Sequence, residues 1–320
     1  MIFPWKIGNF AVKILKVMSD FKPKGHIAML GANVMWGLMS PVAKLLMATG
    51  VVTPFLLTGF RIFGAAALFW LTSLFARPEH VPSRDLMLLA GAAMLGILFN
   101  QGCFIFGVGL TSPGEASIIT TTMPMWVMVL AAVILREPIT WLKAGGVIVG
   151  ASGALMLVLG GTGVGLKGDN PMLGDMLVLF AQLSYALYLT LYKRFIAKYS
   201  LVTMMKWMFL FASIALLPFS VDTIATTDWT SLTRLHYVGI LYVVGFSTYL
   251  AYACVMVGQK NLRPTLVGIY NYVQPVVASI VGVCLGLDRF TPLKMLAVAL
   301  IFGGVFLVTR SKARTQGGQA

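Results

Sequence analysis

Ten apolar runs separated by short polar junctions are the feature that most constrains the fold of this chain. A helix needs about 20 apolar residues to cross the ~30 Å hydrocarbon core of a bilayer. The runs occupy residues 26–47, 54–76, 86–108, 113–135, 140–160, 173–193, 201–219, 235–257, 264–286 and 291–310. Lipid offers no partner for an unpaired backbone amide, so each run is predicted to be a helix. The sequence therefore predicts an all-α polytopic membrane protein with ten transmembrane helices.

The overall composition agrees with a membrane fold. Hydrophobic residues make up 58% of the 320 positions and charged residues 11%, whereas a typical soluble protein has about 25% charged residues. Too few polar side chains remain to cover a soluble surface. The net charge of +14 does not indicate a nucleic-acid partner, because most Lys and Arg lie in the junctions between apolar runs. We expect a lipid bilayer as the surrounding partner and no nucleic acid.

The distribution of Lys and Arg predicts the orientation. With the N-terminus inside, the inner segments hold 17 of these residues and the outer segments hold 4. Such an excess marks the cytoplasmic side of a membrane protein. Both termini are therefore predicted to be cytoplasmic, in a cell inner membrane. Residues 1–24 form an N-terminal segment, either an interfacial amphipathic helix or a disordered lead-in, and residues 311–320 form a cytoplasmic tail.

The second half of the chain repeats the first. At an offset of 151 residues the matched pairs include Pro124 with Pro275 and Glu137 with Asp288, and at an offset of 149 they include Asn33 with Gln182 and Trp36 with Tyr185. The predicted units are a first repeat at 25–160, a linker at 161–172 and a second repeat at 173–310. Each repeat has five spans, an odd number, so the second copy enters the membrane from the opposite side. Inverted repeats are typical of secondary transporters, whose substrate site lies near the midplane between the halves.

Two segments resemble a known family. They are GFRIFGAAALFWL, which contains Arg61, and SPGEASIITTTMPMWVMVLAAVILREPITWLKAGGVIVGASGALML, which contains Pro124 and Glu137. Both are similar to the EamA-type transporters of the drug/metabolite transporter superfamily, and the resemblance covers about residues 25–310. It implies ten helices in two repeats and transport of small metabolites, often export of amino acids. The second repeat departs from the pattern, because Asp288 stands where glutamate is usual and Leu210 stands at the counterpart of Arg61.

Polar and aromatic residues deep within the spans are the candidates for contact with a substrate. A polar group in lipid is costly unless it faces a cavity or a partner. The candidates are Asn33, Trp36, Arg61, Asn100, Gln101, Glu115, Gln182, Tyr185, Tyr188, Tyr252, Tyr270, Asn271 and Gln274. Amides can bond the polar ends of a metabolite, and aromatic rings supply adaptable apolar surface. The alternative is that these side chains only hold helices together.

Four of the candidates carry more specific expectations. Arg61 and Glu115 lie at a similar depth near the outer side, so Arg61 either pairs with Glu115 or meets a substrate carboxylate. The same pair makes protons a candidate coupling ion, because an acid changes its pKa when a neighbouring cation leaves. Asn100 and Gln101 point about 100° apart on a helix, and we expect one to face the substrate and the other a neighbouring helix.

Structural roles are predicted for two equivalent pairs. Pro124 and Pro275 lie within spans and are expected to act as hinges; the alternative is that nearby hydroxyls and amides only satisfy the carbonyl that each proline frees. Thr120 to Thr122 precede Pro124. Glu137 and Asp288 close spans at an inner and an outer turn, where Glu137 is expected to accept hydrogen bonds from the amides that open the next helix.

The function favoured by the sequence is a secondary transporter of small metabolites that works by alternating access, as an exporter of amino acids or related compounds. It is expected to be a monomer or a weak homodimer, with no cofactor and no metal site. The alternatives are a channel-like facilitator and an intramembrane enzyme. An enzyme would need paired acids, a metal set or an activated nucleophile at membrane depth, and the sequence contains no such set. A channel is expected to have rings of charge or of carbonyls.

Overall fold

The computed structural model describes residues 23–47, 50–110, 116, 119–159, 170–284 and 291–311. These ranges are almost entirely helical and contain no strand. The first half consists of α2 (Pro23–Met47), α3 (Pro54–Ser73), α4 (Ser83–Ala93), η1 (Met94–Phe99), α5 (Asn100–Leu110), α7 (Met123–Ile134) and α8 (Trp141–Leu159). The second consists of α9 (Pro171–Leu191), α10 (Lys193–Ile196), α11 (Leu201–Thr226), η2 (Trp229–Ser231), α12 (Arg234–Leu241), η3 (Tyr242–Leu250), α13 (Ala251–Asn261), α14 (Pro264–Ile269), η4 (Tyr270–Tyr272), α15 (Val273–Cys284) and α16 (Pro292–Arg310).

Within the described ranges, five continuous helical stretches are long and apolar enough to cross a membrane. They are Pro54–Ser73, Ser83–Leu110, Met172–Leu191, Leu201–Thr226 and Arg234–Asn261. Shorter apolar helices cover Met123–Ile134, Trp141–Met156 and Met295–Arg310. The prediction of an all-α polytopic membrane protein is confirmed. Several features predicted from the sequence lie outside the described residues, namely residues 1–22, the linker at 160–169, Glu115, Asp288 and residues 312–320.

Local sequence signals explain where several helices begin. Thr53, Asn170 and Ser200 each accept a hydrogen bond from the backbone amide three residues further on, which caps α3, α9 and α11. Pro54 and Pro171 follow their caps at the first helical position. A proline is favourable there because the amide that it lacks would have no partner within the helix.

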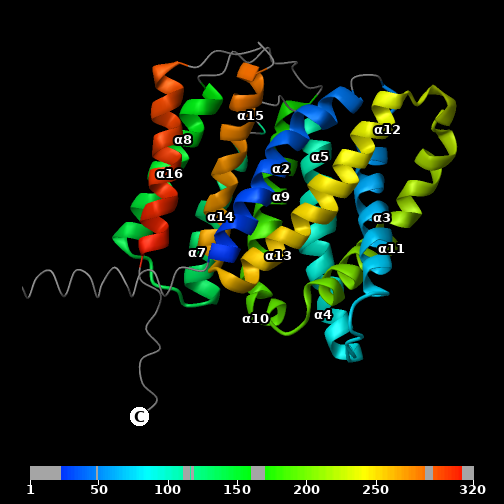
Figure 1. The fold of residues 1–320 in the computed structure, drawn as a ribbon, viewed down its shortest axis with the longest axis horizontal. Coiled ribbons are helices and arrows are strands. Elements are labelled where there is room, and N and C mark those ends of the chain that lie inside the picture. The colour runs from blue at the N-terminus through cyan, green and yellow to red at the C-terminus, as the bar shows by residue number, and fades with distance from the viewer. Residues whose placement is uncertain are drawn as a thin grey trace, which may run out of the picture.

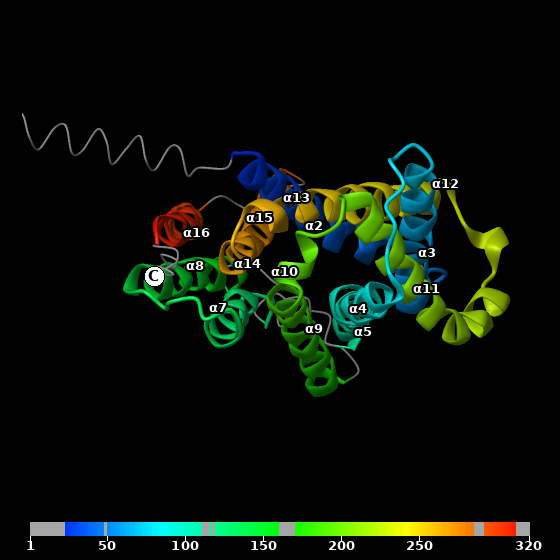
Figure 2. The same cartoon turned by 90° about the horizontal axis from the view of Figure 1, so that it is seen from below.

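The helices pack as two copies of one arrangement. α2 packs against α13 and α15 in the same way that α9, its counterpart, packs against α5 and α7. The pairs α8–α16 and α3–α11 each join equivalent helices of the two halves. Figure 2 shows these two pairs toward opposite ends of the molecule, so a pseudo-twofold axis runs between them through the centre. α2 begins and α16 ends on the same side of the molecule, the lower side of their helices in Figure 1. The fold consists of two inverted five-helix repeats.

Glycines allow the closest of these contacts, between α8 and α16. A Cβ atom on Gly304 would lie 2.5 Å from the carbonyl oxygen of Gly146, and one on Gly153 would lie 2.6 Å from the carbonyl oxygen of Ala297. Gly304 is the counterpart of Gly153, and Ala297 is the counterpart of Gly146. The two approaches are therefore one contact repeated by the pseudo-symmetry. Small residues at such positions let helix backbones come together in a membrane.

Two helical irregularities occur at equivalent places that the sequence did not predict. The π-helical segments η1 and η3 interrupt the third and eighth spans, and they end at the matched residues Phe99 and Leu250. A π-turn is wider than an α-turn and is often found at a functional site. Here each segment directly precedes a stretch that carries candidate residues, Asn100 and Gln101 in one case and Tyr252 in the other.

The span predicted at 201–219 ends too early. α11 continues to Thr226, with Pro218 inside it. A proline removes one backbone bond and disturbs the preceding turn, but it does not prevent the helix from continuing after it. The hydroxyl of Ser220 donates to the carbonyl of Leu216 at 3.0 Å within this part of the helix. Much of the polar stretch after residue 219 is therefore helical.

Glu137, in the turn after α7, does not cap the next helix as expected from the sequence. Arg136 has a φ of 53°, a left-handed conformation that ends α7. The backbone amide of Lys143 is capped by the Thr140 hydroxyl at 3.2 Å, so the cap is supplied by threonine and not by Glu137. The Glu137 carboxylate instead accepts from the ammonium of Lys143 at 2.7 Å and from the Thr265 hydroxyl at 3.3 Å. Sequence spacing could not show this, because Thr265 belongs to the other repeat.

Candidate functional site

A polar cavity lies between the two repeats. It is lined by Trp36, Met39, Arg61, Asn100, Gln101, Phe104, Thr120, Gln182, Tyr185, Tyr252, Asn271 and Gln274. The volume open to the centre of a water-sized sphere is about 70 Å³, whereas a single water needs about 10–15 Å³ by this measure. The cavity therefore has room for several waters or for a small organic molecule.

Most residues predicted from the sequence meet at this cavity. Those that line it are Trp36, Arg61, Asn100, Gln101, Gln182, Tyr185, Tyr252, Asn271 and Gln274. Asn33, Tyr188 and Tyr270 do not line it, and Glu115 lies outside the described residues. Met39 and Phe104 were missed as candidates because they are apolar residues within apolar spans. Their only signal was their spacing, since each lies three residues after a candidate on the same helical face.

Gln101 and Tyr252 meet at the pseudo-twofold axis. They are counterparts in the two repeats, 151 residues apart, and the Nε2 atom of Gln101 donates to the Tyr252 hydroxyl at 2.8 Å. That hydroxyl in turn donates to the carbonyl of Gly96 at 3.4 Å. The Oε1 atom of Gln101 is buried and accepts no hydrogen bond from any described residue. This oxygen is therefore an unused acceptor in the wall of the cavity.

Arg61 places a positive charge in the same wall. Its side chain projects from α3 and is 3% exposed. Its Nε donates to the hydroxyl of Thr248 at 3.1 Å, and Thr248 donates onward to the carbonyl of Val243 at 2.7 Å. The acidic residues within the described ranges do not line the cavity. The Arg61–Glu115 ion pair suggested by the sequence stays a prediction.

Side-chain amides join the helices around the cavity. Gln274 donates to the Oδ1 atom of Asn33 at 3.0 Å, and Asn33 donates to the carbonyl of Met29 at 2.8 Å. Asn33 therefore supports Gln274 from behind the lining. Asn100 donates to the carbonyl of Ala181 on α9 at 3.0 Å. Both Asn100 and Gln101 border the cavity, although only one was expected to face it, because long side chains 100° apart can still reach a broad opening.

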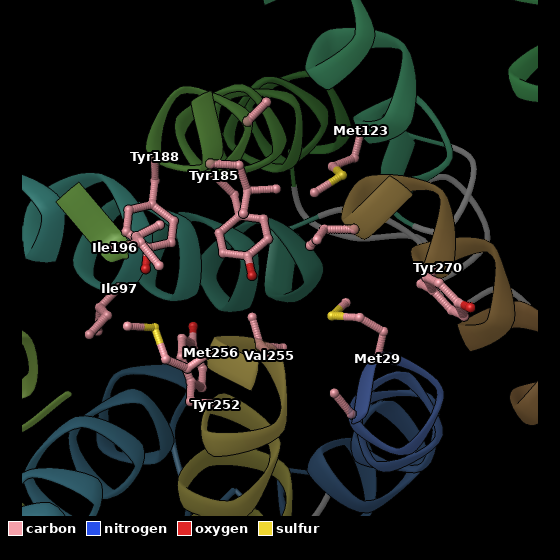
Figure 3. Close-up of a cluster of buried hydrophobic side chains, with 14 of the residues drawn as sticks. Met29, Ile97, Met123, Tyr185, Tyr188, Ile196, Tyr252, Val255, Met256 and Tyr270 are labelled. Carbon is pink, nitrogen blue, oxygen red and sulfur yellow. The ribbon is translucent and has the colours of Figure 1, made fainter. Parts of the chain in front are cut away.

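Aromatic side chains form the remainder of the wall and the packing below it. The indole of Trp36 lies edge-on to Tyr252 and Tyr185, with ring centroids 5.7 Å and 6.4 Å apart. Its Nε1 donates to the carbonyl of Ser247 at 2.9 Å, which fixes the ring. Figure 3 shows Tyr185 and Tyr188 pointing from α9 toward α13, where Tyr252 lies.

Tyr188 and Tyr270 are buried in the packing outside the cavity lining. The Tyr188 hydroxyl donates to the side-chain oxygen of Gln259 at 3.1 Å. The Tyr270 hydroxyl lies 2.6 Å from Nδ1 of His26. Both contacts lie toward the end of the molecule where α2 begins. The sequence could not separate these tyrosines from Tyr185, since all are single aromatic residues within apolar spans.

The two predicted hinge prolines follow equivalent breaks in their helices. Pro124 lies at the start of α7, directly after the turn at Thr121 and Thr122. Pro275 lies in the first turn of α15, directly after the 3-10 segment η4. The second break separates the short helix α14 from α15. Whether the chain bends at these points stays a prediction.

These features define a class of protein: a polytopic membrane protein in which two inverted five-helix repeats enclose a polar cavity, the architecture of secondary transporters. The model of the EamA-like transporter family matches residues 23–159 and again 172–310. The chain belongs to that family, and the resemblance seen in its sequence is confirmed.

Relatives and one solved structure agree with this assignment. The uncharacterized transporter YetK of Bacillus subtilis (strain 168) is 26% identical, over 90% of this chain and 87% of YetK. The uncharacterized inner membrane transporter YedA of Escherichia coli (strain K12) is 27% identical, over 89% of this chain and 90% of YedA. A solved crystal structure superposes with a TM-score of 0.72 at 17% identity, over 90% of this chain and 97% of the other, which shows the fold alone. The chain is thus a membrane transporter by family.

Proposed function

We propose that this protein is a secondary transporter that moves small metabolites across a cell inner membrane by alternating access, and that it exports amino acids or related compounds. One observation carries the proposal. The cavity is lined from both repeats and combines a buried arginine, several amides and aromatic rings. Placed polar groups combined with aromatic and apolar side chains are typical of small-molecule sites. YetK and YedA are named transporters, without a substrate in either name.

The inverted repeat supplies a mechanism for alternating access. Two halves that are related by a twofold axis in the membrane plane can exchange conformations, which moves the opening from one side to the other. The equivalent breaks before Pro124 and Pro275 are the proposed bending points. The contacts of Tyr188 and Tyr270 lie toward the end where α2 begins, and they are proposed to close the cavity on that side, which is cytoplasmic if both termini are cytoplasmic. A monomer, or a weak homodimer, suffices for this cycle.

Protons are the proposed coupling ion, with Glu115 as the group that binds them. An acid beside Arg61 would change its affinity for a proton when the arginine engages the cargo. The test is transport by Glu115→Gln across a range of pH in proteoliposomes. We expect the pH dependence of the rate to flatten in the variant, with Glu79→Gln as a control acid outside the spans. An unchanged profile would remove Glu115 as the coupling group.

Counterflow in proteoliposomes tests the proposed function. Vesicles containing the purified protein are loaded with an unlabelled amino acid, and entry of the labelled compound is followed for amino acids and related metabolites. A transporter shows saturable flux and counterflow, so labelled compound accumulates transiently. A channel passes the compound without counterflow, and an enzyme converts it to a product that chromatography detects. Absence of competition by every amino acid would contradict the proposed class of cargo.

A further inference from the structure

We infer that Arg61 and Gln101 form a two-point site for a small monocarboxylate that carries an amino or hydroxyl group on the adjacent carbon. The inference rests on the proposed transport function and specifies the chemistry of the cargo. It assigns the carboxylate to the guanidinium of Arg61 and the donor group to the Oε1 atom of Gln101. Each assignment follows from a separate buried group.

The guanidinium of Arg61 is suited to bind an anion. It presents five N–H donors, of which Nε–H is directed at Thr248. The two terminal nitrogens make no hydrogen bond with the described residues, and neither of the ion pairs seen among these residues includes Arg61. Burying a charge without a partner is costly. A carboxylate is the matching ligand, because it can accept two parallel hydrogen bonds from a guanidinium.

The Oε1 atom of Gln101 is suited to accept a hydrogen bond from the cargo. Gln101 is 2% exposed, and this oxygen has no donor among the described residues. With the side-chain amide in this orientation, the Tyr252 hydroxyl accepts from Nε2 at 2.8 Å and therefore does not donate to Oε1. Leaving a buried acceptor without a partner costs about 1–3 kcal/mol. An ammonium or a hydroxyl group on the cargo would remove that cost.

The spacing of the two groups suits a donor next to the carboxylate. Arg61 is held by Thr248, and Gln101 is held by Tyr252, four residues further along the same span. Both side chains line the same cavity. A short molecule held in this cavity can therefore approach both side chains.

The site exists in one copy, so the cargo can bind in only one orientation. The pseudo-symmetry would place a second pair at Leu210 and Tyr252, the counterparts of Arg61 and Gln101. Leucine cannot bind a carboxylate, so the carboxylate is directed to the first repeat only. Arg61 is the one ionised side chain among the described lining residues, and Trp36, Met39 and Phe104 supply the apolar part. The remainder of the cargo is therefore expected to be uncharged and apolar.

Binding of four matched probes to the full-length protein in lipid nanodiscs tests the inference. The probes are leucine, leucinamide, 4-methylpentanoate and 2-hydroxy-4-methylpentanoate; leucinamide lacks the carboxylate, and 4-methylpentanoate lacks the donor. We expect leucine and the hydroxy acid to bind about tenfold or more tightly than the other two, since one charge-assisted hydrogen bond is worth about that factor. The inference is overturned if the native protein binds none of the four saturably, or binds all four alike.

Variants assign each preference to its residue. Arg61→Gln should bind leucine and leucinamide equally, and Gln101→Met should bind leucine and 4-methylpentanoate equally, while Leu210→Met should behave as the native protein. Arg61→Lys keeps the charge but not the paired bonds, so it should keep a reduced preference for the carboxylate even if Arg61→Gln does not fold. Preferences that persist in both Arg61 variants would overturn the inference.

Two further results separate this inference from the proposed function. If counterflow persists with cargo that lacks a carboxylate, the transporter stands and the two-point site is wrong. If the native protein binds leucine with these preferences but shows no counterflow, the site stands and the proposed function is wrong. Rescue of an unstable Glu115→Gln variant by Arg61→Gln, with unchanged probe preferences, would identify Glu115 as the permanent partner of Arg61 and overturn the inference.

Discussion

Lys143 shows how one buried charge can depend on one partner. Its side chain is 1% exposed and that of Glu137 is 13% exposed, and the two atoms Nζ and Oε2 lie 2.7 Å apart. Removal of one member of a buried pair leaves the other without compensation, which typically costs about 3 kcal/mol or more. The pair also joins α8 to α14 in the other half, through the contact of Glu137 with Thr265.

Lys143→Met should therefore lower the free energy of unfolding by about 3 kcal/mol, measured by thermal or denaturant unfolding in detergent. The double variant Lys143→Met/Glu137→Gln should recover much of the loss, because it leaves no unpaired carboxylate. Glu137→Ala should lower stability or expression more than it alters substrate preference. A changed preference at native stability and expression would contradict a structural role for Glu137.

Glu79, an exposed acid in the loop after α3, makes contacts that depend on its ionisation. Burial of Glu79 disfavours its charged form, yet hydrogen bonds from the backbone amide of Ser200 and from the hydroxyls of Thr203 and Ser200 hold the pKa of Glu79 below its usual range. The Ser200 amide lies 3.0 Å from the nearer carboxylate oxygen. Glu79 therefore ties the loop after α3 to the start of α11 while it is ionised.

A carboxyl group whose pKa is lowered in the folded state stabilises the protein at pH values above its unfolded-state pKa, which is about 4.3 for Glu. This stabilisation is lost as the pH falls through the folded-state pKa. The melting temperature of the native protein should exceed that of Glu79→Gln at neutral pH, and the difference should shrink as the pH falls below about 4.3. Paired thermal scans of both proteins measure this. A difference of constant size down to pH values well below that range would show that ionisation of Glu79 is not its source.

At the scale of helices, the contact between α8 and α16 depends on glycine on one face only. A Cβ atom on Gly304 would meet the Gly146 carbonyl oxygen at 2.5 Å and the Gly150 nitrogen at 2.7 Å, both rigid backbone atoms. A Cβ atom on the adjacent residue, Gly303, would meet nothing within 4 Å. The two neighbours therefore separate the effect of packing from the effect of helix propensity.

Gly304→Ala should force the two helices apart and lower the melting temperature, whereas Gly303→Ala should leave it unchanged or raise it. Alanine favours a helix over glycine by about 1 kcal/mol, so the direction of the change at Gly303 gives the reference. Thermal unfolding of both variants in the same detergent measures the effect. Equal melting temperatures would mean that the α8–α16 contact does not require a bare backbone at Gly304.

At the scale of the whole molecule, the excess of Lys and Arg predicts which side of the membrane each loop faces. His80, in the loop between α3 and α4, should be cytoplasmic, and Thr230, in η2, should be outside. Both residues are exposed. In a background without Cys103, Cys254 and Cys284, Thr230→Cys should react with an impermeant maleimide in intact cells. His80→Cys should react only after the membrane is opened, and the reverse pattern would invert the proposed topology.

The sequence by itself determined the number of spans, the helical class and the inverted repeat. Apolar length, charge distribution and matched residues such as Pro124 and Pro275 are properties of a segment or of two aligned segments, and they need no knowledge of packing. The sequence also identified most residues of the cavity, because a polar side chain within an apolar span is costly wherever the helix is placed. It failed where an apolar side chain lines the cavity, as with Met39.

Only the tertiary structure decided which side chains meet. The contacts of Gln101 with Tyr252, Arg61 with Thr248 and Glu137 with Thr265 join residues more than 100 positions apart. Such contacts depend on how far each helix is rotated about its axis, and the π-helical segments η1 and η3 change that rotation just before the cavity residues. Hydropathy along the chain does not record this rotation, because the apolar surface of a span is similar all round.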